Sequence, residues 1–213
     1  MVAAATSLCL AFSGNASTIS YTNSIGLSLD DWTNTVPVIQ FNPGYGTLQS
    51  IQFTVQSGFS TYLTIDNNSS TDSSGESFTQ LNQYLLDGSY HLFNSSPVLS
   101  YISSDFSYSL SGNQSTNSGL LTASAQATGN LITDNQTLAD FVGGGFVDLT
   151  SYTFTRTFLS NSGGNTAASQ STTSYFTTIV TYTYVPEPSV MAMGGLGLLL
   201  LAFRFRRFGV RQF

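Results

Sequence analysis

The chain has 213 residues, of which 41% are hydrophobic and 13% aromatic, so it can bury one sizeable core. Only 8% of the residues are charged and none is a lysine, so Ser, Thr, Asn and Gln must supply the polar surface. All eleven acidic residues lie at or before Glu187, whereas four of the five arginines lie in the last ten residues. An acidic body lacks the cationic contacts that nucleic acids and anionic membrane surfaces need, and we expect no nucleic-acid partner.

The first segment, residues 1–16, is apolar and ends in small residues, a pattern that signal peptidases accept. It lacks a charged start, so we expect a signal peptide whose true beginning lies upstream of Met1. Cleavage after Ala16 would remove Cys9, the only cysteine, and would leave no disulfide. The alternatives are a lipid-modified Cys9, for which the preceding residues are a poor signal, and a buried N-terminal strand or helix.

Residues 17–184 carry the period-two alternation that is typical of β-strands. Turn-forming clusters separate the strands, and one helical turn is expected at Leu138–Val142. Because no repeat or linker divides this stretch, we predict one extracellular all-β domain, an antiparallel β-sandwich of which a jelly roll is one form. The strand-like segments are 36–41, 51–55, 84–93, 98–102, 141–149, 152–158 and 180–184, with turns at 42–46, 87–88, 111–113 and 162–165 and a polar loop at 66–75.

Calcium is the only metal for which the residues offer a candidate site. Asp66, Asn68 and Asp72 have the alternating spacing with which a calcium loop begins. Thr71 and Ser77 stand where an EF-hand loop needs its glycine and its bidentate glutamate. The competing interpretation is a solvated turn, and no other cofactor is expected.

Residues that usually carry catalysis are sparse. His91 is the only histidine, and we expect it to be a packed or surface residue. Glu76, the one glutamate ahead of the tail, lies in a Ser/Gly-rich stretch that we expect to be flexible. We therefore expect no enzyme, with a secreted hydrolase that uses a carboxylate pair as the second alternative. The aspartates considered for it are scattered over strand edges and turns: Asp30, Asp31, Asp105, Asp140 and Asp148.

Aromatic side chains offer a different kind of site, because they can stack on sugar rings. The candidates are Trp32, Tyr45, Tyr62 and Tyr101. Core packing is the competing interpretation, and we expect it for Trp32. A module that holds matrix polysaccharide is therefore the first alternative function.

The end of the chain has three parts. Pro186, Glu187 and Pro188 predict an extended linker, because each proline fixes φ and lacks a donor. Residues 190–203 are apolar and uncharged, and as a helix they would span about 21 Å of a bilayer core of ~30 Å. The positive-inside rule places the arginines that follow in the cytoplasm and the acidic domain outside. These arginines are Arg204, Arg206, Arg207 and Arg211.

This order resembles the PEP-CTERM sorting signal over residues 185–213, with Arg204, Arg206 and Arg207 as the basic stop. The resemblance implies recognition by an exosortase, a membrane enzyme that processes exported proteins near the motif in Gram-negative bacteria that make exopolysaccharide. We expect a non-enzymatic protein of the cell envelope, cell surface or biofilm matrix, which meets the membrane at least transiently through 190–203. A plain membrane anchor is the alternative.

A second resemblance covers residues 31–53. Trp32-Thr33, Phe41-Asn42-Pro43 and Gly46-Thr47-Leu48 are similar to the opening of the choice-of-anchor E domain, in which an aspartate usually stands in place of Asn42. Tyr182-Thr183-Tyr184 matches the end of that domain. The resemblance implies an extracellular β domain and no particular activity.

Overall fold

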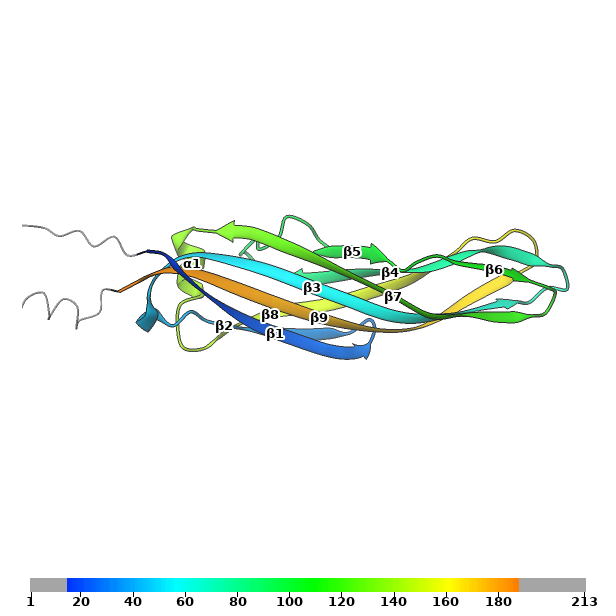
Figure 1. The fold of residues 1–213 in the computed structure, drawn as a ribbon, viewed down its shortest axis with the longest axis horizontal. Coiled ribbons are helices and arrows are strands. Elements are labelled where there is room, and N and C mark those ends of the chain that lie inside the picture. Colours follow the sequence, from blue (N-terminus) through cyan, green and yellow to red (C-terminus); the bar gives the residue numbers. More distant parts are fainter. Residues whose placement is uncertain (1–14, 188–213) are drawn as a thin grey trace, which may run out of the picture.

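The alternating segments form strands in two antiparallel sheets, as a computed structural model of the chain shows for residues 15–187 (Figure 1). The prediction of an all-β sandwich is confirmed. The first sheet has the order β1-β9-β3-β7, with bounds Ser17–Leu29, Thr166–Pro186, Gly46–Asn67 and Ser115–Ile132. The second has the order β2-β8-β4-β5, with bounds Thr33–Ile39, Phe146–Leu159, Ser73–Leu86 and Leu99–Ile102, and β6 (Phe106–Leu110) also pairs with β4.

The pairing is nested along the chain. The first strand pairs with the last, β2 pairs with β8, and β3 pairs with β7 as well as with β9. Strands from the first half of the chain thus pair with strands from the second half, alternately in one sheet and in the other. This is the arrangement of a jelly roll. Residues 15 and 187 lie at the same end of the elongated sandwich, here called the terminal end (Figure 1).

Two short helical segments close the terminal end. The 3-10 turn Pro43–Tyr45 follows Asn42, whose Oδ1 accepts a hydrogen bond from the Gly44 amide at 2.9 Å. Helix α1 (Asn135–Asp140) begins after Asp134, whose Oδ1 accepts from the Thr137 amide at 2.8 Å. The turn predicted at 42–46 is confirmed. The predicted helical turn exists but begins ahead of Leu138, because Asp134 caps it.

The apolar core lies toward the terminal end. It includes the fully buried side chains of Phe41, Phe53, Phe141, Phe176 and Tyr182. A smaller cluster of Ile65, Tyr108 and Leu110 lies toward the opposite end, here called the hairpin end, where the turns 68–72, 111–114 and 160–165 meet.

Between the two apolar clusters the interior is polar. Thr61 and Thr172 face each other with 2.7 Å between their hydroxyl oxygens, and Gln83 Nε2 donates to Ser151 Oγ at 2.8 Å. The Tyr101 hydroxyl donates to Ser57 Oγ at 2.9 Å. These groups and the buried Thr79, Thr153, Thr155 and Ser174 form a polar belt. Thr153 and Ser174 donate to Asp30, and Thr79 donates to Gln170, so the hydroxyls of these three residues find hydrogen-bond partners at the margin of the belt.

Within residues 15–187, no helix is long and apolar enough to cross a membrane. The predicted helix 190–203, most of the predicted signal peptide 1–16, Pro188 and Arg204, Arg206 and Arg207 lie outside these residues.

Candidate binding face and sorting end

The outer face of the second sheet carries two pairs of stacked aromatic rings. Tyr84 and Tyr152 lie opposite each other on β4 and β8, with ring centres 4.5 Å apart and planes 2° apart. Phe78 and Phe158 lie opposite each other six residues farther along, with centres 4.7 Å apart and planes 17° apart. At the rise of a β-strand, the two pairs are about 20 Å apart.

Polar groups and one more aromatic ring fill the space between the pairs. Arg156 Nε donates to Gln80 Oε1 at 2.9 Å, and the guanidinium lies 4.6 Å from the centre of the Phe158 ring. Phe154 lies opposite Asn82 and is 49% exposed. We call this surface the aromatic face, and its residues are Phe78, Gln80, Asn82, Tyr84, Tyr152, Phe154, Arg156 and Phe158.

The outer face of the first sheet has a different chemistry. Hydroxyl groups pair across its strands, at 2.9 Å between Ser20 and Thr181 and at 3.0 Å between Ser24 and Thr177. Two tyrosines, Tyr62 and Tyr175, are partly exposed there, at 47% and 37%. The stacked aromatic pairs therefore distinguish the second sheet, and exposed apolar area gathered in one place marks an interaction surface.

The four aromatic candidates from the sequence do not share a site. Trp32 packs against the main core and its Nε1 donates to Ser174 Oγ at 2.9 Å, so its predicted core role is confirmed. Tyr101 is part of the polar belt, and burial raises its pKa. Tyr45 lies at the terminal end beside Tyr184, and Tyr62 lies on the outer face of the first sheet, opposite Leu120 of β7.

The predicted calcium residues lie around the β3–β4 turn. Asp66 belongs to β3, and its carboxylate accepts a hydrogen bond from Ser115, whereas Asn68 and Asp72 are exposed. The buried neighbour Asn67 sets the shape of the turn. Among residues 15–187, no group of three or more His, Cys, Asp or Glu side chains is placed to hold a metal ion.

The carboxylates have structural partners or lie apart. Asp30 Oδ1 accepts from Ser174 Oγ at 2.9 Å, and Asp31 Oδ1 accepts from the Thr155 amide at 2.8 Å. The expected flexibility of Glu76 is wrong, because it lies in β4 between β6 and β8 and its carbonyl accepts from the Ser160 amide at 2.8 Å. Asp105 lies between β5 and β6, and Asp140 ends α1.

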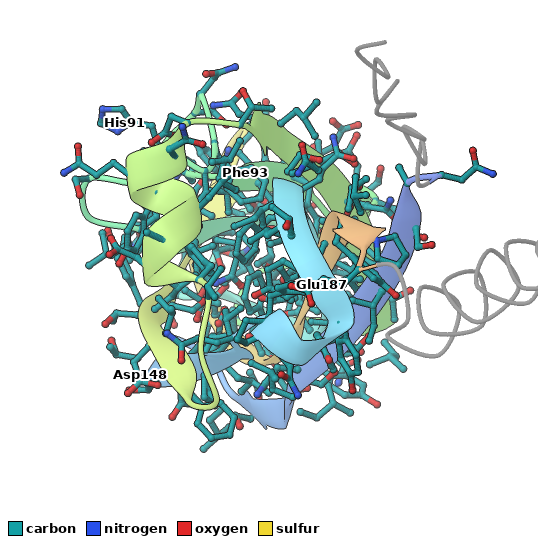
Figure 2. All side chains as sticks on the ribbon, turned by 90° about the vertical axis from the view of Figure 1, so that its left-hand side faces the viewer. His91, Phe93, Asp148 and Glu187 are labelled. Atoms are coloured by element: carbon teal, nitrogen blue, oxygen red, sulfur yellow. The ribbon has the colours of Figure 1, made fainter. Side chains whose placement is uncertain are left out.

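His91 is exposed at the terminal end, as predicted for a packed or surface residue. Figure 2 looks onto this end and shows His91 and Asp148 at separate margins of the molecule. The histidine lines a shallow hollow with Asp134 and Asp140, and the first of these carboxylates is already engaged as the cap of α1.

The segment from Val185 onward, here called the sorting end, begins inside the first sheet. Strand β9 runs between β1 and β3, and its last residue, Pro186, lies in register with Gly46. A side chain at position 46 would meet the Val185 carbonyl oxygen at 2.1 Å, and Gly46 also has a φ of 140°, so glycine is required there. Glu187 follows and is exposed on the terminal end (Figure 2).

The inner strand β9 of the β-sandwich therefore continues directly into the segment Pro186-Glu187-Pro188. Residues 185–207 match the PEP-CTERM protein-sorting motif. This motif indicates an exported bacterial protein that an exosortase sorts to the cell envelope.

A search of curated proteins finds no match for the chain. Among solved structures, a structure of infectious bursal disease virus strain Gx is similar at 11% identity and TM-score 0.20, over 84% of this chain and 38% of that one. The mud crab tombus-like virus structure is similar at 9% identity and TM-score 0.21, over 86% and 96% of the two chains. Likenesses this weak carry no argument about fold or function, and the resemblance to the choice-of-anchor E domain stays a prediction.

Proposed function

We propose that this protein is a non-enzymatic component of the cell envelope or exopolysaccharide matrix of a Gram-negative bacterium, and that its aromatic face holds neutral polysaccharide. The observation that carries the proposal is the arrangement of two stacked ring pairs with polar side chains between them on an open sheet face.

The arrangement matches the chemistry of a sugar chain. Each sugar ring has an apolar C–H face that packs on an aromatic ring and a rim of hydroxyls that bonds to amides and guanidinium groups. Gln80, Asn82 and Arg156 supply such polar groups between the rings. Because the rings already stack on each other, little side-chain entropy is lost when a ligand settles on them.

Charge favours a neutral polymer. Arg156 is the only arginine ahead of position 204 and the chain has no lysine, whereas all eleven acidic residues lie at or before Glu187. An acidic polysaccharide would therefore meet net repulsion over most of the domain.

Binding to immobilised polysaccharides tests the proposal, with the full exported chain and neutral and acidic polymers in parallel. Phe154→Ala should weaken binding to the neutral polymer about tenfold, the effect of about 1.4 kcal/mol of lost ring contact. The matched control is Tyr62→Ala, an aromatic residue of similar exposure on the other sheet, which should bind as the parent does. Equal losses in both variants, a preference for acidic polymers or silence across all polymers would each contradict the proposal.

A further inference from the structure

The two edges of the first sheet are long, and within residues 15–187 no strand is hydrogen-bonded to their outer sides. Its edge strands β1 and β7 have 13 and 18 residues, and neither contains a charged residue or a proline. The edges of the second sheet are of the protected kind, because β2 contains Pro37 and β5 has only 4 residues. Monomeric proteins usually prevent edge strands from pairing with another chain by means of lysine, proline or short strands.

Backbone groups along these edges are free to pair. The loop after β4 covers one end of β7, where the Asn130 amide donates to the Leu92 carbonyl at 2.8 Å. Within the part of the chain that the structure describes, no backbone hydrogen bond reaches Leu120–Thr128 from the side away from β3, or Ser17–Ile25 from the side away from β9. These two stretches are also those in which the register is uninterrupted.

Strand direction determines which edges can join. Each neighbouring pair in β1-β9-β3-β7 is antiparallel, so β1 and β7 of one molecule run in opposite directions. They form opposite edges of the sheet, β7 at the top and β1 at the bottom of Figure 1. A second copy in the same orientation therefore presents its β1 antiparallel to β7 of the first.

We propose that β7 of one copy pairs with β1 of a second copy of this chain, which extends the first sheet from molecule to molecule. The contact is head-to-tail, so it repeats and produces a row. Every copy in the row has its sorting end on the same side. This orientation is compatible with chains that are all exported across the same membrane. Pairing of β7 with β7, or of β1 with β1, would turn one copy over and send its tail the opposite way.

The side chains of the two edges fit this contact. Through the register of the sheet, Ser24 lies level with Gln126 and Ile25 with Ala125. Ser24 and Gln126 are both exposed on the outer face, whereas Ile25 and Ala125 both turn toward the core. Antiparallel pairing at this level would thus continue the polar outer face and the apolar inner face without a break.

Cysteine cross-linking tests the contact in the full chain carrying Cys9→Ser. Ser24→Cys is combined in turn with Thr122→Cys, Ser124→Cys or Gln126→Cys, which scans the register. Within one molecule these positions are three strand spacings apart, about 14 Å, and a disulfide cannot close over that distance. We expect a ladder of covalent oligomers from one of the three double variants, and no dimer from any single variant. Monomers from all three, or dimers from the single variants, would overturn the proposal.

Sedimentation of the full chain supplies a second measurement. Thr122 on β7 and Ser60 on β3 lie opposite each other, so a lysine can be placed at the edge or one strand inward. Thr122→Lys should reduce the associated fraction at least tenfold, whereas Ser60→Lys should leave it unchanged. A parent chain that sediments as a monomer at every concentration, or equal effects of the two lysines, would overturn the proposal. The aromatic face lies on the second sheet, so this result does not depend on it.

Discussion

The Asn67 side chain connects two turns at the hairpin end. It is 2% exposed, and its Nδ2 donates to the Thr71 carbonyl at 2.8 Å and to the Ser111 carbonyl at 3.1 Å. Its Oδ1 accepts from the Ser69 amide at 3.1 Å. One amide therefore satisfies groups from two separate turns.

Asn67→Ala should lower the free energy of unfolding by about 2–3 kcal/mol, because three hydrogen bonds of one buried side chain are lost together, at about 1 kcal/mol each. Urea denaturation measures this change. The neighbouring exposed Asn68 gives the control, and Asn68→Ala should stay within about 0.5 kcal/mol of the parent. A loss of the same size in both variants would contradict the role assigned to Asn67.

Tyr101 makes stability depend on alkaline pH. Burial raises the pKa of Tyr101 above its ordinary value of 10.0, although the hydrogen bond with Ser57 lowers it in part. Above pH 10 the phenol ionises in the unfolded chain and keeps its proton in the folded one, so the unfolded state gains stability as pH rises. Tyr101→Phe should flatten the fall in the free energy of unfolding between about pH 9 and about pH 11.

The control for Tyr101 is Tyr62→Phe, which removes one hydroxyl from an exposed tyrosine and is measured over the same pH range. Burial also raises the pKa of Tyr182, so some alkaline loss should persist in Tyr101→Phe. Identical pH profiles for the parent and Tyr101→Phe would show that Tyr101 titrates equally in both states.

Single residues were the hardest level to predict from sequence. The alternating oxygens at Asp66, Asn68 and Asp72 are compatible with the start of a calcium loop or with a solvated turn, but the residue that organises the turn is Asn67, between two of them. Its partner Ser111 is far away along the chain. No local spacing can report a contact of that kind, because only folding brings the two turns together.

At the scale of elements, a tyrosine ring of β9 covers a glycine of β3. Gly58 lies opposite Tyr175, and a Cβ at position 58 would lie 2.4 Å from Tyr175 Cε1. The ring covers the bare backbone of the glycine, a known way to stabilise glycine in a sheet.

Gly58→Ala should therefore lower the free energy of unfolding by about 1–3 kcal/mol, because the tyrosine ring must move. Gly26, in β1, has open space around its Cα, and Gly26→Ala should change stability by less than about 1 kcal/mol. Thermal unfolding compares the two variants. If the two substitutions lower stability equally, the contact of Gly58 with Tyr175 does not contribute to stability.

Strand β8 shows what periodicity can and cannot predict. The alternation over 152–158 predicted a strand, and this is confirmed. The structure buries Thr153 and Thr155 in the polar belt and turns Tyr152 and Phe154 outward. Threonine, tyrosine and phenylalanine all suit strands, so the alternation does not reveal which set faces inward. The aromatic face was missed for this reason.

For the whole molecule, composition and turn chemistry were enough to predict a β-sandwich, but not which strands pair. The contact of Ser17 with Tyr184 joins residues almost at opposite ends of the domain, and such pairings leave no signal in a single sequence. The sorting motif was predictable because its three parts are contiguous in the chain, and residues 185–207 match it.

Processing of the tail is the prediction that belongs to the whole molecule. In a host that has its exosortase, the mature chain should be lighter than the full chain by a C-terminal piece, as intact mass spectrometry can measure. Glu187→Ala should reduce this processing, whereas Glu76→Ala, a change at an exposed glutamate on β4, should leave it intact. If the protein has its full-length mass both in the host with exosortase and in the host without it, the prediction is contradicted.

The place of β9 in its sheet has a mechanical consequence. A tether attached beyond Glu187 pulls along the axis of a strand that is bonded to β1 on one side and to β3, from Gly46 to Asn67, on the other. The ladder bonds lie across that axis, so the load is shared in shear among many bonds at once and does not break them one after another. Drag on material held at the domain surface would thus act against the most resistant direction of the fold.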